Sequence, residues 1–204
     1  MLEASDLELE RGGRRLFRSL SLALAGGELL RVAGANGSGK TTLLKILCGL
    51  LSPQAGEVRW EGTPIRLLRE EFSKQLLYLG HAPAVKDELT AAENLSIACT
   101  LAGVTASEQS VREALDAYGL PRMDVPVRSL SQGQRRRAAL ARLLLSAAVP
   151  LWLLDEPFTA LDAKAARFTS ELIAQHVARG GAAVYTTHQD AAIGAAVARV
   201  IELE

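Results

Sequence analysis

The sequence predicts an α/β protein in which an antiparallel β part comes first, a parallel sheet forms the core, and a helical insert separates two sets of core strands. Three observations predict this order. Residues 2–25 alternate in the manner of strands, a glycine-rich loop at 34–41 follows a short apolar run, and residues 90–145 carry mainly helical patterns before apolar strands return. A length of 204 residues fits one domain with a sizeable core.

Turn and capping residues set the expected boundaries of these elements. Strands are expected at residues 2–9 and 16–25 around the Gly12-Gly13 turn, and then at 29–33, 57–60 and 75–79, with a helix at 41–50. Thr90 and Glu93 form a capping-box start for the first helix of the insert. Further helices are expected at about 107–118, 131–145 and 162–179, and further strands at 151–154, 182–186 and 199–203.

Composition and charge argue against several classes of protein. Lys+Arg and Asp+Glu both number 23, and this balance argues against nucleic acid as the main partner, because phosphate-backbone binding normally requires a basic excess. The longest apolar stretch, 143–154, is broken by Pro150 and is too short to span a bilayer. The acidic N-terminus is unlike a secretory signal. Cys48 and Cys99 lie in no metal-type spacing and suit a reducing compartment.

Residues 34–41 match the phosphate-binding pattern G-x-x-x-x-G-K-[ST], with a predicted strand before them and a helix after them. Glycines let successive backbone N–H groups turn toward a phosphate chain, and the helix N-terminus adds positive potential. Lys40 is expected at the β- and γ-phosphates, Thr41 on Mg²⁺, and Thr42 at the α/β-phosphates. The full expected set is Gly34, Ala35, Asn36, Gly37, Ser38, Gly39, Lys40, Thr41 and Thr42. Alone, the loop indicates only a nucleoside triphosphate, since GTPases, kinases and many ATPases share it.

Two carboxylates, Asp155 and Glu156, end the apolar run at 151–154. The C-terminal end of a buried parallel strand is where ligands bind in such sheets. Asp155 is therefore expected to hold Mg²⁺, and Glu156 to orient or deprotonate the attacking water. The alternative is a pair of solvated loop acids, which the apolar run and the rigid Pro157 disfavour.

Residues 130–134, Leu-Ser-Gln-Gly-Gln, are followed by Arg-Arg-Arg-Ala-Ala-Leu-Ala-Arg and resemble the signature loop and helix of ABC ATPases. The family's aspartate loop follows at Ala160-Leu161-Asp162, and its switch histidine at His188. The resemblance covers nearly the whole chain. It implies a P-loop ABC-ATPase nucleotide-binding domain, with residues 1–80 and 148–204 as the ATP-binding core and about 81–147 as the helical subdomain. The arginine run is more typical of the signature helix than of a nucleic-acid patch.

The resemblance also implies a head-to-tail dimer with ATP between the phosphate loop of one copy and the signature loop of the other. Because one chain carries both the phosphate loop and the signature loop, two identical copies suffice to form complete ATP sites. Catalytic residues would be Glu156, His188 and Lys40, and His188 would sense the γ-phosphate. The residues expected to act in trans are Ser131, Gln132, Gly133, Gln134 and Asp162. His176, in contrast, is expected to be an ordinary surface or core residue.

Three positions depart from the family pattern. Gln132 stands where glycine is commonest. The aromatic residue that usually stacks on adenine is absent, so Arg11, through its guanidinium plane, or Phe17 is the expected base contact. His81 replaces the usual coupling-loop glutamine as a ligand near the metal, which adds a potential pH dependence near neutrality.

The run at 76–95 resembles the ATP-binding subunits of cytochrome c maturation transporters, often called haem exporters. This implies that ATP hydrolysis powers a membrane step in c-type cytochrome biogenesis, either haem export or haem delivery. The chain would be cytoplasmic and peripheral on the inner face of the cell membrane, with an integral-membrane permease docked at about 81–126. No Cys-x-x-Cys-His motif or other direct haem site is seen.

Three alternatives remain at this point. The chain is compatible with the ATPase subunit of another small ABC exporter, where only the partner differs. A non-transport ABC ATPase acting on DNA or ribosomes typically has two cassettes or long insertions, and neither is visible. A nucleotide kinase or GTPase would leave the signature loop unexplained, and no Asn-Lys-x-Asp guanine motif is present.

Overall fold

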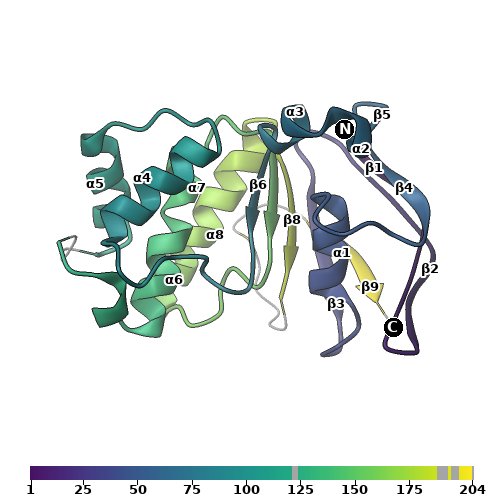
Figure 1. The fold of residues 1–204 in the computed structure, drawn as a ribbon, viewed down its shortest axis with the longest axis horizontal. Helices are drawn as coiled ribbons and strands as arrows, with labels where there is room; N and C mark the ends of the chain where they lie inside the picture. Colours follow the sequence, from purple (N-terminus) through teal and green to yellow (C-terminus); the bar gives the residue numbers. More distant parts are fainter. Residues whose placement is uncertain (121–123, 188–192, 194–197, 204) are drawn as a thin grey trace.

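The computed structural model describes residues 1–120, 124–187, 193 and 198–203 of the chain. Two sheets lie on one side of the molecule and a group of helices on the other, with α1 between the two sheets (Figure 1). One sheet has four strands in the order β2-β1-β4-β5, and the other has five in the order β6-β7-β8-β3-β9. The predicted α/β class and the order of its parts are confirmed.

The first sheet is antiparallel and consists of β1 (Leu2–Arg11), β2 (Arg14–Leu24), β4 (Ala55–Trp60) and β5 (Thr63–Pro64). Leu2 faces Leu24 of β2 and Trp60 of β4 in the register. Alternate residues of β1 are buried, as its hydrophobic pattern requires, because only one face of the sheet packs on the core. The hairpin extends two residues beyond the predicted strand, to Arg11.

The second sheet is parallel and contains β3 (Leu29–Gly34), β6 (Leu76–Leu79), β7 (Leu151–Leu154), β8 (Ala182–Thr186) and β9 (Ala198–Leu203). Every residue of β7 and β8 is buried. Continuous apolar runs of this kind are typical of central parallel strands that are covered on both faces. The C-terminal ends of β3, β6, β7 and β8 therefore meet at one edge, where the sequence places its polar residues.

Helix α1 (Lys40–Leu47) packs between the sheets and buries Leu43, Leu44, Ile46 and Leu47 in their shared core. It is shorter than the predicted helix at 41–50. Two four-residue helices, α2 (Ile65–Leu68) and α3 (Glu70–Ser73), connect β5 to β6 and were not predicted.

The helical side contains α4 (Ala91–Leu101), α5 (Glu108–Ala117), α6 (Gln132–Leu140), α7 (Arg142–Leu145) and α8 (Ala163–Ala178), with a short 3₁₀ turn at Val127–Ser129. The capping box of α4 is confirmed, because Glu93 N donates to Thr90 Oγ1 at 3.1 Å and Thr90 N donates to Glu93 Oε2 at 2.8 Å. The predicted helix at 131–145 is divided at Ala141. Across the described residues, no helix combines the length and apolarity needed to cross a membrane.

Candidate functional site

The glycine-rich loop turns between the end of β3 and the start of α1. Lys40 is buried, and its Nζ donates to the carbonyl oxygens of Gly34 at 2.7 Å and Ala35 at 2.9 Å, which closes the loop around the lysine. Gly34 has a φ of 141°, and a Cβ there would lie 2.5 Å from the Leu203 carbonyl oxygen. Gly39 also has a positive φ, of 101°. Because L residues rarely adopt these values, the loop requires glycine at both positions.

The loop opens onto a cleft of about 610 Å³, a size within the usual range for small-molecule sites. Its lining combines the first hairpin, the glycine-rich loop, the loop after β6 and the segment after β7. The lining residues are Arg11, Leu16, Asn36, Gly37, Gly39, Lys40, Thr41, Thr42, His81, Glu156 and Thr159. Residues as far apart in the sequence as Arg11 and Thr159 are thus brought together at one edge of the parallel sheet.

Phe17 does not line this cleft. Its side chain is buried, and its ring lies where a Cβ on Gly39 would be 3.0 Å away. The ring therefore packs against the glycine-rich loop at Gly39. This buried position of Phe17 disagrees with the expectation that it contacts a base. Its neighbour Leu16 faces the cleft instead, together with the exposed Arg11.

The two acids after β7 are not solvated loop residues. Asp155 is fully buried, and its Oδ1 accepts a hydrogen bond from Thr186 Oγ1 at 2.8 Å. Asp155 Oδ2 is buried without a hydrogen-bond partner among the described residues. Glu156 has a φ of 53° and donates its N–H to the same Thr186 oxygen at 2.8 Å. This backbone conformation turns Glu156 into the cleft while Asp155 stays beneath it.

Arg136 of α6 contacts the backbone of both acids; the sequence indicated it only as part of the arginine run of the signature helix. Its guanidinium donates to the carbonyl oxygens of Asp155 and Glu156, both at 2.8 Å. Burial lowers its pKa, and the nearby carboxylates of Asp155 and Glu156 oppose that shift. The only available signal was helical spacing, since Arg136 shares the buried face of α6 with Leu140.

The signature loop lies at the start of α6. Ser131 caps this helix by accepting from Gln134 N at 3.2 Å, and Gln134 Oε1 accepts from Ser131 N at 2.8 Å. Gln132 is exposed, and Gly133 lies so close to the aspartate loop that a Cβ would be 2.9 Å from the Ala160 carbonyl oxygen.

Asp162 caps α8 by accepting from Ala165 N at 2.8 Å. None of the five residues expected to act in trans lines the cleft of its own chain. The predicted switch histidine, His188, lies outside the described residues.

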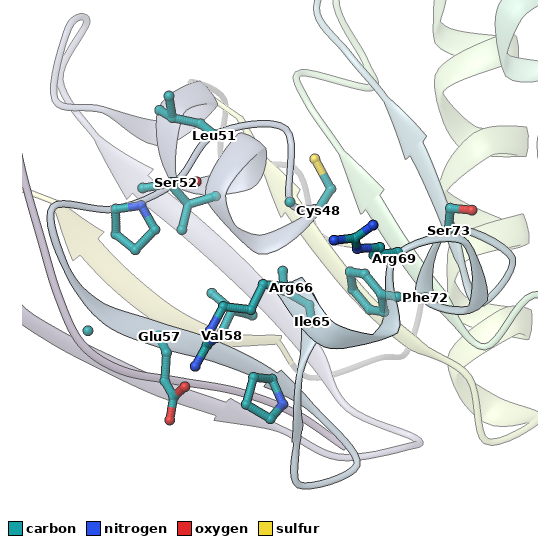
Figure 2. A pocket seen from close by; sticks show the side chains of 15 residues that line it. Cys48, Leu51, Ser52, Glu57, Val58, Ile65, Arg66, Arg69, Phe72 and Ser73 are labelled. Atoms are coloured by element: carbon teal, nitrogen blue, oxygen red, sulfur yellow. The ribbon is translucent and has the colours of Figure 1, made fainter.

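A second cavity, of about 390 Å³, lies between the end of α1, β4 and the pair α2–α3. Figure 2 shows Val58, Ile65 and Phe72 around it, with the guanidinium groups of Arg66 and Arg69 nearby. It shares no lining residue with the first cleft. It therefore contains none of the glycine-rich loop.

Comparison with known proteins agrees with this geometry. The sequence pattern of the ABC transporter family matches residues 17–159. A solved dimer of the cassette MJ0796 bound to ADP and Pi is 25% identical, covers 100% of this chain and 94% of its own, and has a TM-score of 0.85. A putative ABC transporter ATP-binding protein from Pyrococcus furiosus shares the fold, with a TM-score of 0.83 at 24% identity over 99% of this chain and 96% of that one. The fold and site thus define the ATP-hydrolysing cassette of an ABC transporter.

Curated relatives narrow the assignment. A cytochrome c biogenesis ATP-binding export protein CcmA from Aromatoleum aromaticum is 55% identical over 94% of this chain and 90% of its own length. Proteins of the same name from Dechloromonas aromatica and Pseudomonas aeruginosa are each 50% identical, over 100% of both chains in the first case and 95% of both in the second. The chain belongs to this CcmA family of ABC transporter ATP-binding subunits.

Proposed function

We propose that two copies of this chain hydrolyse Mg·ATP and thereby power a membrane step in c-type cytochrome biogenesis, either the export or the delivery of haem. The observation that carries the proposal is the cleft itself, which brings Lys40, Thr41 and Glu156 to one edge of the sheet. The export role follows from family membership, since the relatives are named for cytochrome c biogenesis and export. Residues 1–80 and 148–204 act as the ATP-binding core, and about 81–147 as the helical subdomain.

Within the cleft, the residues of this chain divide the work. The Lys40 ammonium exchanges its contacts with the Gly34 and Ala35 carbonyls for the phosphate oxygens, and the loop N–H groups and the α1 N-terminus bind the rest of the chain of phosphates. Glu156 orients the attacking water and accepts its proton. His188, in the role of γ-phosphate sensor, completes the set on the strength of the family resemblance.

Mg²⁺ fits the donors that are available. Asp155 Oδ2, which has no hydrogen-bond partner in the described part of the chain, and the hydroxyl of Thr41 are hard oxygen ligands of the kind the ion prefers. In the described part of the chain no group of three His, Cys, Asp or Glu side chains is assembled for a metal, and Mg²⁺ usually takes one or two protein ligands with phosphates and water. When bound, the ion neutralises phosphate charge. His81, exposed at the cleft, would contact a metal-bound water.

The active site is completed by a second copy. Ser131 and Gly133, which do not line the cleft of their own chain, contact the γ-phosphate held by the other chain in this proposal, with Gln132, Gln134 and Asp162 at the same interface. The dimeric state of the solved MJ0796 cassettes supports this arrangement.

The membrane partner is an integral-membrane permease that docks on the helical subdomain at about 81–126. This places the cassette on the inner face of the cell membrane. Two apolar side chains of α4, Ile97 and Leu101, are 47% and 84% exposed and lie one turn apart. Their exposure supports a contact with an apolar partner surface.

The catalytic part of the proposal is tested with Glu156→Gln. The variant keeps the size and position of the side chain but removes the base, so we expect ATP affinity within about 3-fold of wild type and turnover reduced by about 100-fold or more. Maturation of c-type cytochromes in cells dependent on the variant should fail. Near-normal hydrolysis would contradict the role of Glu156.

Docking is tested with Ile97→Lys/Leu101→Lys, followed by affinity purification from native membranes. We expect the variant to lose the co-purifying membrane protein while it still binds ATP. Leu67→Lys is the matched control, because Leu67 is 64% exposed but belongs to α2 beside the second cavity. If the α4 variant retains the membrane protein and the Leu67 variant loses it, the docking surface lies beside the second cavity instead.

A further inference from the structure

The side chain of Arg136 contacts two segments of the chain and belongs to a third. Its Nη1 donates to Gly80 O at 2.9 Å and to His81 O at 3.3 Å, in the loop after β6. Its Nη2 donates to the carbonyl oxygens of Asp155 and Glu156, after β7. The residue itself belongs to α6, the helix that begins at the signature loop. One side chain therefore joins the signature helix to two of the three segments that follow parallel strands and line the cleft.

Burial of the Arg136 guanidinium costs free energy unless hydrogen bonds compensate for the lost hydration. The residue is only 4% exposed, and transferring a charged group from water to the protein interior costs several kcal/mol before its partners compensate. Its described hydrogen-bond partners are four backbone carbonyls. A guanidinium suits this task because its planar fork presents several fixed donors at once, whereas an ammonium presents a single point of charge.

Glu156 needs such support because its backbone is strained. A φ of 53° is unfavourable for a residue with a Cβ and costs on the order of 1–2 kcal/mol unless neighbours hold it. Its N–H is bound by Thr186 Oγ1 and its carbonyl by Arg136 Nη2, each at 2.8 Å. The peptide groups on both sides of the residue are thus fixed from two different elements. These two contacts fix the backbone from which the side chain projects, and Thr159 Oγ1 donates to Glu156 Oε2 at 3.3 Å.

The geometry points to Arg136 as a positioning residue that sets the orientation of Glu156 and of the His81 loop for ATP hydrolysis. This inference rests on the proposed role of Glu156. Because Arg136 does not line the cleft, we expect it to act through the two segments it binds rather than by contact with the nucleotide. A movement of the signature helix would be transmitted directly to the catalytic acid.

The inference is tested by Arg136→Lys and Arg136→Gln. Neither side chain can bind both pairs of carbonyls, so we expect kcat for ATP to fall by about 10-fold or more while KM stays within about 3-fold, because the phosphate loop is untouched. Arg135→Lys is the control on the same helix. Arg135 binds Leu130 O and Arg128 O and pairs with Asp87, outside the cleft. The kcat of the Arg135→Lys variant should therefore stay within about 2-fold of wild type.

Two measurements distinguish a positioning role of Arg136 from a purely structural one. Turnover is expressed per bound nucleotide, which removes any misfolded fraction, and Arg136→Lys is repeated in the Glu156→Gln background. We expect a clearly smaller loss there than in the wild-type background, because the effect through Glu156 is already removed and only the effect through the His81 loop remains. An unchanged kcat in Arg136→Lys and Arg136→Gln, or losses that multiply in the double variant, would overturn the inference. Normal turnover in Glu156→Gln alone would instead overturn the proposed role of Glu156.

Discussion

The hydroxyl of Thr186 donates to Asp155 Oδ1 at 2.8 Å, which ties the end of β8 to the end of β7. The same oxygen accepts the N–H of Glu156 at 2.8 Å. One buried hydroxyl thereby fixes the side chain of the first acid and the backbone of the second. It also leaves Asp155 Oδ2 directed to a site without a partner among the described residues, which is the oxygen that suits Mg²⁺.

Thr186→Val removes this hydroxyl and keeps the shape of the side chain. Two buried polar groups lose a partner, so we expect the free energy of unfolding to fall by about 1–3 kcal/mol and kcat to fall by about 10-fold. Thermal melting and steady-state ATPase kinetics provide the measurements. Thr186→Ser retains the hydroxyl and should recover most of the activity. Equal kcat in the Val and Ser variants would contradict the positioning role.

Much of this architecture was predictable because its signals are local. Alternation in β1, the continuous apolar run of β7 and the Thr90–Glu93 capping box each depend on residues within one element. The helices α2 and α3 were missed because four residues are too few to show a helical period. The cleft was anticipated in outline, since the ends of parallel strands must meet at one edge.

Other features depend on packing across the fold, which no local pattern reports. Arg136 is one of three consecutive arginines, and only the packing of α6 decides which of them turns inward. Thr186 closes a strand in the same way as many threonines, and its contact with Asp155 needs the register of β7 on β8. Phe17 was predicted at the base because of its type and position, but the first sheet turns it under Gly39.

The second prediction concerns the close approach of Gly133 to Ala160. In Gly133→Ala the new methyl would meet the Ala160 carbonyl oxygen at 2.9 Å and push the two loops apart. Because Gly133 does not line the cleft, nucleotide affinity of a single chain should stay within about 2-fold, while turnover and ATP-dependent dimerisation fall by about 10-fold. Equilibrium binding and light scattering measure the two effects.

Gly62→Ala is the control for a general loss of stability in that experiment. Gly62 has a φ of 78° and no atom within 4 Å of its Cβ position. Its substitution should lower stability by about 1 kcal/mol without changing turnover per folded protein. A Gly133→Ala variant that dimerises and hydrolyses ATP as well as Gly62→Ala would remove Gly133 from the proposed interface.

The third prediction concerns base recognition by Arg11. No aromatic side chain is among the described residues that line the cleft, and Arg11 is the exposed group at its hairpin side. If its guanidinium stacks on adenine, Arg11→Ala should raise KM for ATP by about 3- to 10-fold with little change in kcat, and Arg11→Tyr should restore or lower KM. Identical KM values in all three proteins would exclude Arg11 as the base contact.

The last prediction concerns acid stability and follows from His176, which is a core residue. Its ring is 2% exposed and stacks on Trp152 with centroids 3.9 Å apart and planes at 4°. Burial lowers its pKa from 6.5 to about 4, an effect that the nearby Arg179 reinforces and that the hydrogen bonds to the Ala182 and Pro150 carbonyls oppose. The native state therefore favours the neutral imidazole, whereas the unfolded chain binds a proton below its ordinary pKa. Stability from this group is complete above pH 6.5 and is lost as pH falls toward 4.

Between pH 7.5 and pH 5 this linkage should remove about 2 kcal/mol from the free energy of unfolding. Urea denaturation at the two pH values measures it. His176→Gln has no titrating group in this range and loses the stacking contact, so it should be less stable than wild type at pH 7.5. The difference between the two proteins should shrink by about 2 kcal/mol at pH 5, because only wild type loses the contribution of a neutral histidine. A difference that stays constant with pH would show that the proton enters the folded core at little cost.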